Sequence, residues 1–149
     1  MRRLYSLLLA AMLGAAGCDN VVDSVRTHLQ PSGDPHVRVF AADERTTYAA
    51  ALAALDQVDF HFTHGGPAEG ELEAMSSITH DADGSRQVSL AAEFRAANGG
   101  GTEVTVRMKE ILETDPDAHL GQGTETPLRD TPLYEVFFRN ISQQLELKK

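Results

Sequence analysis

Two alternating segments joined by a glycine-rich turn constrain the fold of this chain more than any other feature. The apolar residues of QVSLAAEFR and of TEVTVRMK each share one face, and they are Val88, Leu90, Ala92 and Phe94 in the first segment and Val104, Val106 and Met108 in the second. The linking AANGGG supplies the asparagine and glycines that a tight hairpin requires. A three-residue loop at 98–100 sets Phe94 opposite Val104 and Arg95 opposite Glu103, and both pairings are favourable in an antiparallel sheet. The pattern therefore predicts an antiparallel hairpin with one apolar face.

Three shorter segments also alternate in the manner of strands. In HVRVFAA, the residues Val37, Val39 and Ala41 alternate with Arg38 and Phe40. DFHFTH places Phe60 and Phe62 on one side, and ELEAM turns Leu72 and Ala74 inward. The intervening GGPAEG is a turn. These segments predict three further strands.

Two segments have the spacing of amphipathic helices. In residues 43–58 the predicted apolar stripe is Tyr48, Ala51, Leu52 and Leu55, and Asp43 is the expected N-cap. The segment 131–147 begins with Thr131 as N-cap, Pro132 in the first helical position and Glu135 in the first turn. Its stripe is Tyr134, Phe137, Phe138, Ile141 and Leu145.

The order of these elements is β-α-β-β-β-β-α. These strands are apolar on one face and polar on the other. The apolar face must be covered by other elements, and the polar face stays in water. We therefore expect an α+β fold of two layers, in which two helices cover one face of an antiparallel sheet.

The first residues have the layout of a secretory signal peptide. Arg2 and Arg3 supply a positive start, and residues 4–17 are uncharged, mostly apolar and end in small residues. A helix that spans a bilayer needs about 20 apolar residues, so this segment is too short for a permanent transmembrane anchor.

The only cysteine of the chain, Cys18, follows that segment directly. The stretch AAGC, with Ala16 and Gly17 before Cys18, resembles the lipobox of bacterial lipoproteins. The resemblance implies that the thiol receives a diacylglycerol, that the chain is cut before Cys18, and that the new amino group is acylated. Two or more acyl chains hold a protein on a membrane stably.

Ordinary signal peptidase is the alternative for the same bond, because Ala15 and Gly17 are small at the spacing that this enzyme uses. Asp19 resembles the inner-membrane retention signal of enteric bacteria, a rule that other lineages do not follow. The sequence is therefore compatible with an anchor in either the inner or the outer membrane.

The sequence thus predicts three parts: a signal peptide at 1–17, the lipidated cysteine with a tether at 18–36, and a single α+β domain at 37–149. Pro31, Gly33 and Pro35 break the chain within the tether. The order of elements over roughly 36–147 resembles the helix-grip domains of a lipoprotein component of the outer-membrane barrel-assembly machine and of related small Gram-negative lipoproteins. That resemblance implies an accessory role in the cell envelope and assigns no site residues.

Charge and motifs exclude several functions. The formal net charge is -9, and loss of residues 1–17 removes two arginines and no acid, which makes it -11. Such a surface repels nucleic acid. The nucleophile-elbow, P-loop, zinc-protease and dinucleotide fingerprints are all missing from the sequence. We expect neither enzymatic activity nor a cofactor.

Histidines and aspartates occur in DFHFTH and in THDADG, the segment before QVSLAAEFR. His61, His64, His80, Asp81 and Asp83 are ligand types, but His61 and His64 are expected on opposite faces of an alternating strand. DADGSR differs from a calcium loop in the position of its glycine and lacks the bidentate glutamate, where Ala92 stands instead. We expect no metal.

Two surfaces remain as candidates for binding. The polar face of the sheet is either a solvated surface or a docking surface, and it carries Glu71, Glu73, Glu93, Arg95, Glu103, Arg107 and Lys109. The polar segment 113–130 is expected to be a long loop, and such loops are often functional. Its candidate interaction residues are Asp115, Asp117, His119, Gln122, Glu125 and Arg129.

The sequence therefore favours a non-enzymatic lipoprotein of the Gram-negative envelope, anchored by lipid in one of the two membranes and facing the periplasm. Its expected partners are the membrane and an envelope protein. The alternative is a lipoprotein that binds a small ligand or a cell-wall fragment between the sheet and the final helix.

Overall fold

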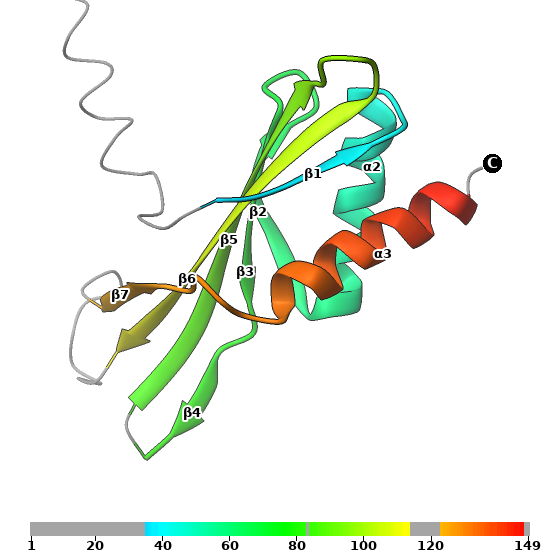
Figure 1. Ribbon diagram of the computed structural model, residues 1–149. Helices are drawn as coiled ribbons and strands as arrows, with labels where there is room; N and C mark the ends of the chain where they lie inside the picture. The colour runs from blue at the N-terminus through cyan, green and yellow to red at the C-terminus, as the bar shows by residue number, and fades with distance from the viewer. Residues whose placement is uncertain (1–34, 83, 114–122, 148–149) are drawn as a thin grey trace, which may run out of the picture. The chain divides into compact units, whose positions relative to one another are not determined.

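The computed structural model describes residues 35–82, 84–113 and 123–147, all within one compact unit, Pro31–Lys149. These residues form an antiparallel sheet of seven strands and two α-helices (Figure 1), which confirms the α+β class. The strands are β1 (His36–Phe40), β2 (Phe60–Gly66), β3 (Glu71–Ser76), β4 (Thr79–Asp81), β5 (Gly84–Ala96), β6 (Thr102–Glu113) and β7 (Thr124–Pro127). The helices are α2 (Glu44–Leu55) and α3 (Leu133–Leu147), and a single 3₁₀ turn, η1 (Asp56–Val58), follows α2.

The predicted hairpin, β5 and β6, is the longest pair of the sheet and organises the rest. Phe94 pairs with Val104 and Arg95 with Glu103, so the predicted register is confirmed. The strand order is β1-β6-β5-β3-β2, with β4 on the remaining length of β5 and β7 on the remaining length of β6 (Figure 1). Two shorter strands therefore lie one after the other along each side of the hairpin, β1 and β7 beside β6, and β3 and β4 beside β5.

Three consecutive glycines shape the tip of that hairpin. Gly99, Gly100 and Gly101 all have positive φ angles, a conformation that side chains disfavour. A Cβ atom on Gly101 would also overlap the carbonyl oxygen of Phe40. Glycine at 101 therefore allows both the turn and the close approach of the end of β1.

The core lies where the helices meet the sheet. The Tyr48 and Phe94 rings lie 5.3 Å apart, and Phe40 and Phe138 lie 6.3 Å apart, so α2 and α3 each contact the sheet through aromatic side chains. The predicted inward residues Leu72, Ala74, Leu90, Ala92, Phe94, Val104, Val106 and Met108 are all buried, and Val88 is half-buried against the core. Helix α3 buries Tyr134, Phe137, Phe138 and Ile141 of its predicted stripe, and Leu145 is half-buried. The hydrophobic side chains of the hairpin therefore define one shared core with both helices.

The helix starts follow their predicted caps. Asp43 accepts a hydrogen bond from the Thr46 backbone N (2.9 Å) and one from the Thr46 hydroxyl (2.7 Å). These bonds, the hydroxyl first, lower the pKa of Asp43 because they stabilise its charged form. At α3 the Leu133 backbone N donates to Thr131 Oγ1 (3.4 Å), and Glu135 lies in the first turn.

The predicted number of strands is wrong, because the short segments β4 and β7 were not recognised. Each has only three or four residues, exposed or nearly so, without an apolar alternation. Backbone pairing with the long hairpin, rather than side-chain burial, makes these segments strands.

Strand β1 places its charged residues inward, although its valines are the more apolar set. Val37 and Val39 are 52% and 55% exposed, while Phe40 is buried. The inward face is favoured because α3 offers aromatic rings: His36 stacks on Tyr134 at 3.7 Å between centroids, and the Arg38 guanidinium lies 4.8 Å from the centre of Phe138.

Two other apolar residues do not lie where their spacing predicts. Leu52 on α2 is 40% exposed, and Thr47, Ala50 and Ala54 are buried in the same helix. The buried face of α2 is therefore rotated about the helix axis, away from Leu52 and toward the smaller Thr47, Ala50 and Ala54. Phe62 is 46% exposed because β2 is the edge strand beyond β3.

Tyr134 completes the hydrogen bonding of β6 between the two strands that pair with it. β1 pairs with residues 102–106 of β6 and β7 with residues 109–112. In the gap, the Met108 backbone N donates to the Tyr134 hydroxyl (2.8 Å), which in turn donates to the Leu128 carbonyl (2.8 Å). Burial raises the pKa of Tyr134, and the bond from Met108 opposes that rise.

We expect Tyr134→Phe to lower the free energy of unfolding by about 1–3 kcal/mol, because it leaves the buried Met108 N–H without its partner. Tyr48→Phe is the matched control, since the Tyr48 hydroxyl makes no hydrogen bond to any residue described by the structure. That variant is expected to stay within about 0.5 kcal/mol of the unmodified protein. Urea unfolding followed by circular dichroism measures both, and equal losses would contradict the role of the Tyr134 hydroxyl.

Candidate functional site

The candidate site is the end of the sheet that projects away from both helices (Figure 1). We call it the sheet extension and define it as β4, residues 84–88 of β5, residues 109–113 of β6, and β7. Every described residue in it is exposed or half-buried. The extension is therefore a piece of regular sheet that does not enclose a core of its own.

The predicted interaction segment, 113–130, starts at the end of β6 and includes β7, and both belong to this extension. Of its six candidate residues, Asp115, Asp117, His119 and Gln122 lie outside the described residues. The expectation of a loop without regular structure over the whole of 113–130 is wrong, because residues 124–127 form β7 against β6. Threonine at 124 and 126 favours an extended conformation, and proline ends the segment on an edge strand, where it is tolerated.

The two remaining candidate residues are held by other parts of the domain. Glu125 pairs with Ile111, and its Oε2 accepts a hydrogen bond from Lys109 Nζ (2.7 Å). The Arg129 carbonyl accepts one from His36 Nε2 (2.7 Å), and because a carbonyl only accepts, Nε2 carries the hydrogen. The segment that follows residue 122 is thus fixed to the sheet at two points.

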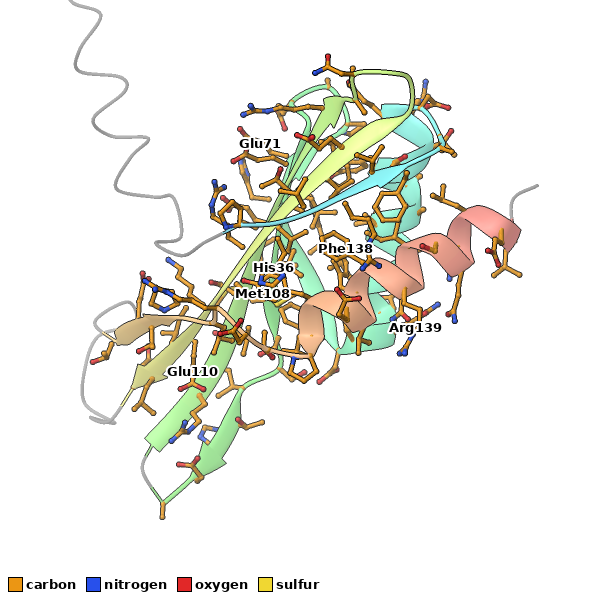
Figure 2. The ribbon with its side chains drawn as sticks, in the orientation of Figure 1. His36, Glu71, Met108, Glu110, Phe138 and Arg139 are labelled. Atoms are coloured by element: carbon orange, nitrogen blue, oxygen red, sulfur yellow. The ribbon has the colours of Figure 1, made fainter. Side chains whose placement is uncertain are left out.

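A small ion-pair cluster holds β4 to the hairpin. Arg86 Nε donates to Asp81 Oδ2 (2.8 Å), and Arg86 Nη1 donates to Glu110 Oε1 (3.1 Å). Figure 2 shows Glu110 on the part of the sheet away from α3. Partly exposed ion pairs contribute about 0–1 kcal/mol each, so this cluster positions the strands more than it stabilises the domain.

The strand register assigns the side chains of the extension to its two faces. Residues directly opposite in an antiparallel pair share a face, so Arg86 and Glu110 continue the face that carries Leu90 and Met108. Lys109, Ile111 and Glu125 lie on the other face. Val88 and Leu112 share the face of Arg86 and Glu110, so both faces of the extension combine apolar and ionic side chains.

The histidines of β2 do not lie on opposite faces, contrary to the expectation from simple alternation. The register of β2 against β3 shifts between Phe62 and His64, so His61 pairs with Met75 and His64 with Glu73. Met75 and Glu73 share a face, and both histidines therefore share it too. Such a bulge inserts one residue and reverses the alternation after it.

A metal site does not emerge from this rearrangement in the part of the chain that the structure describes. Asp81 binds Arg86, and His80 Nδ1 lies 2.9 Å from the Ser85 hydroxyl. Residue Asp83 lies outside the described ranges. Within those ranges no three His, Cys, Asp or Glu side chains are grouped so that they hold an ion.

A hollow of about 330 Å³ lies between the end of β1, the start of α2 and the last turns of α3. Its floor is apolar, with Phe40, Ala41 and Leu145. The Thr46 hydroxyl in its wall already binds Asp43, and the Ser142 hydroxyl binds the Phe138 carbonyl (3.2 Å). Apart from the exposed Glu146 carboxylate, the side chains that line the hollow therefore offer an incoming polar ligand little unsatisfied hydrogen bonding.

Comparisons with known proteins do not assign a family. No family model matches this chain, and no curated protein matches it. Within the described ranges, the helices are too short or too polar to cross a membrane.

Proposed function

We propose that this protein is a lipid-anchored, non-enzymatic lipoprotein of the Gram-negative envelope that presents a protein-interaction domain to the periplasm. Cys18 carries the lipid, residues 18–36 form the tether, and the domain is a two-layer structure with both helices on one face of the sheet. The AAGC stretch and the preceding apolar segment support the anchor.

The sheet extension is the observation that carries the interaction role. Four strand segments are held there by backbone pairing and ion pairs, and among the described residues no further strand pairs with the outer edge of β4 or of β7. A preformed and accessible sheet end suits the recognition of a partner protein in the envelope.

The alternative function, binding of a small ligand or cell-wall fragment, has weaker support. The hollow beside Phe40 has the volume of a small ligand site, but its threonine and serine hydroxyls are engaged within the protein. Specific recognition of a polar ligand needs convergent free donors and acceptors.

Site-specific photo-cross-linking in intact cells tests the interaction role. A photoreactive amino acid at Thr126, an exposed residue of β7, is expected to give discrete adducts with an envelope protein. The same amino acid at Leu52, which is exposed on α2, is the control and is expected to give none above background. Adducts from Leu52 and none from Thr126 would move the interaction surface to the helices.

A further inference from the structure

One face of the sheet extension continues the buried face of the core. Leu90 and Met108 are paired and buried, and the next residues on the same face, Val88 and Glu110, are paired in turn. Figure 2 shows Met108 beside the start of α3 and Glu110 farther along the sheet. We call this part of the sheet the inner face of the extension and define it by Arg86, Val88, Glu110, Leu112 and Thr126.

The helices end where the inner face begins. Tyr134, the second residue of α3, accepts a hydrogen bond from the Met108 backbone N (2.8 Å), which places the start of α3 over Met108. Beyond this point β6 continues from Lys109 to Glu113, a length of about 17 Å for an antiparallel strand. Both described helices lie on the other side of Met108 (Figure 1), so neither of them covers the inner face along this length.

The inner face and the start of α3 form an apolar step. Val88 and Leu112 are half-buried on the sheet, and Leu128 and Leu133 are half-buried just before and at the start of α3. Val88, Leu128 and Leu133 already pack against the core, so an apolar side chain that enters the step would enlarge this core. A helix, which is about 10 Å wide, fits the step and would meet the sheet there as α2 and α3 meet it elsewhere.

The free edges of the extension are poorly suited to an added strand. The Leu128 backbone N donates to the Met108 carbonyl (3.0 Å), so Leu128 points its backbone groups at β6. By alternation, Glu125 and Pro127 point theirs outward. Pro127 has no N–H, which leaves Glu125 as the one residue of β7 with an outward donor. β4, on the opposite edge, has only three residues, so a partner strand would gain few hydrogen bonds at either edge.

The charge of the inner face favours a basic partner. Asp81 lies opposite Gly84 and therefore shares this face with Arg86 and Glu110. Arg86 donates to both carboxylates (2.8 and 3.1 Å), so one cation serves two acidic groups. A lysine or arginine beside the apolar stripe of a partner helix would offset the excess negative charge.

We propose that the inner face of the extension binds an amphipathic helix of a partner protein in the envelope, with basic residues beside the apolar stripe of that helix. The continuity of the inner face with the core, the apolar step and the excess of acidic groups together select this occupant. The inference rests on the proposed interaction role of the sheet extension, and it adds which face is used and what kind of segment the partner supplies.

Photo-cross-linking of the full-length protein in intact cells tests the face. Leu112 and Ile111 are matched positions, because they are neighbours on β6, are both half-buried and lie on opposite faces. A photoreactive amino acid at Leu112 is expected to give the same adduct as one at Thr126, and one at Ile111 is expected to give none above background. The attachment points in the partner, mapped by mass spectrometry, are expected three or four residues apart, as on one side of a helix.

Two charge substitutions test the energetic role of the step. Leu112→Lys is expected to reduce the Thr126 adduct at least about ten-fold, because a charge of the same sign as the partner replaces an apolar contact. Ile111→Lys is the control for folding, since it makes the same change on the other face, and it is expected to leave the adduct unchanged.

The outcomes separate this inference from the proposed function. Equal losses from the two lysine variants, adducts from Ile111 in place of Leu112, or attachment points two residues apart would overturn the helix on the inner face, while the interaction role of the extension would stand. Absence of adducts from Thr126, Leu112 and Ile111 alike would overturn the interaction role itself, and the helix with it.

Discussion

Replacing Phe94 by alanine is expected to lower the free energy of unfolding by about 3–5 kcal/mol, one of the largest effects available in this domain. The Phe94 side chain is 4% exposed and contacts the Tyr48 ring of α2. Its removal leaves a cavity between the hairpin and that helix, and the packed neighbours fill such a cavity only in part. Urea unfolding at neutral pH measures the loss.

Phe62→Ala is the matched control, because the same atoms are removed from a ring that is 46% exposed. Its cost is expected to be about 1 kcal/mol, since close to half of the burial is already missing there and little cavity is left behind. Similar losses from the two variants would mean that the buried face of the sheet has been assigned incorrectly.

Replacing Cys18 by alanine is expected to remove the protein from the membrane fraction or to leave it as an uncleaved precursor. The physical reason is that acyl chains supply the anchor in the proposed lipoprotein, at about 0.8 kcal/mol for each buried methylene group. Radioactive fatty acid is expected to label the unmodified protein and not the variant. Fractionation of cell envelopes measures the distribution.

Asn20→Ala retains the cysteine and the small residues before it, so it is expected to remain labelled and bound to the membrane. An unmodified protein that is unlabelled and fully soluble would contradict lipidation and favour cleavage by ordinary signal peptidase.

The hairpin could be predicted to the exact residue pair because two independent signals agree. The alternation of residues 87–95 and 102–109 fixes the inward face, and the glycines at 99–101 fix the length of the turn. Either signal alone leaves several registers open. Helix α3 was predictable for a similar reason, since its aromatic stripe and its N-terminal cap indicate the same start.

The missed features depend on contacts between distant segments. Nothing in the alternation of β1 shows that α3 will stack aromatic rings on His36 and Arg38, and the register shift in β2 arises only against β3. For the candidate site, the sequence pointed to the segment around Glu125 but not to its pairing with β6. That strand has too few apolar residues to be recognised without its partner.

The way in which β1 is held has a mechanical consequence for a domain on a tether. Any pull on the chain before His36 reaches the domain through β1, which is only five residues long. The Arg38 guanidinium also binds both carboxylate oxygens of Glu135 (3.0 and 2.8 Å), while His36 lies against Tyr134. Tension is thus passed sideways into α3 as well as along the hydrogen bonds to β6. If the chain is anchored by lipid as proposed, a pull on the tether is therefore shared between α3 and β6 and is not carried by the backbone hydrogen bonds of β1 alone.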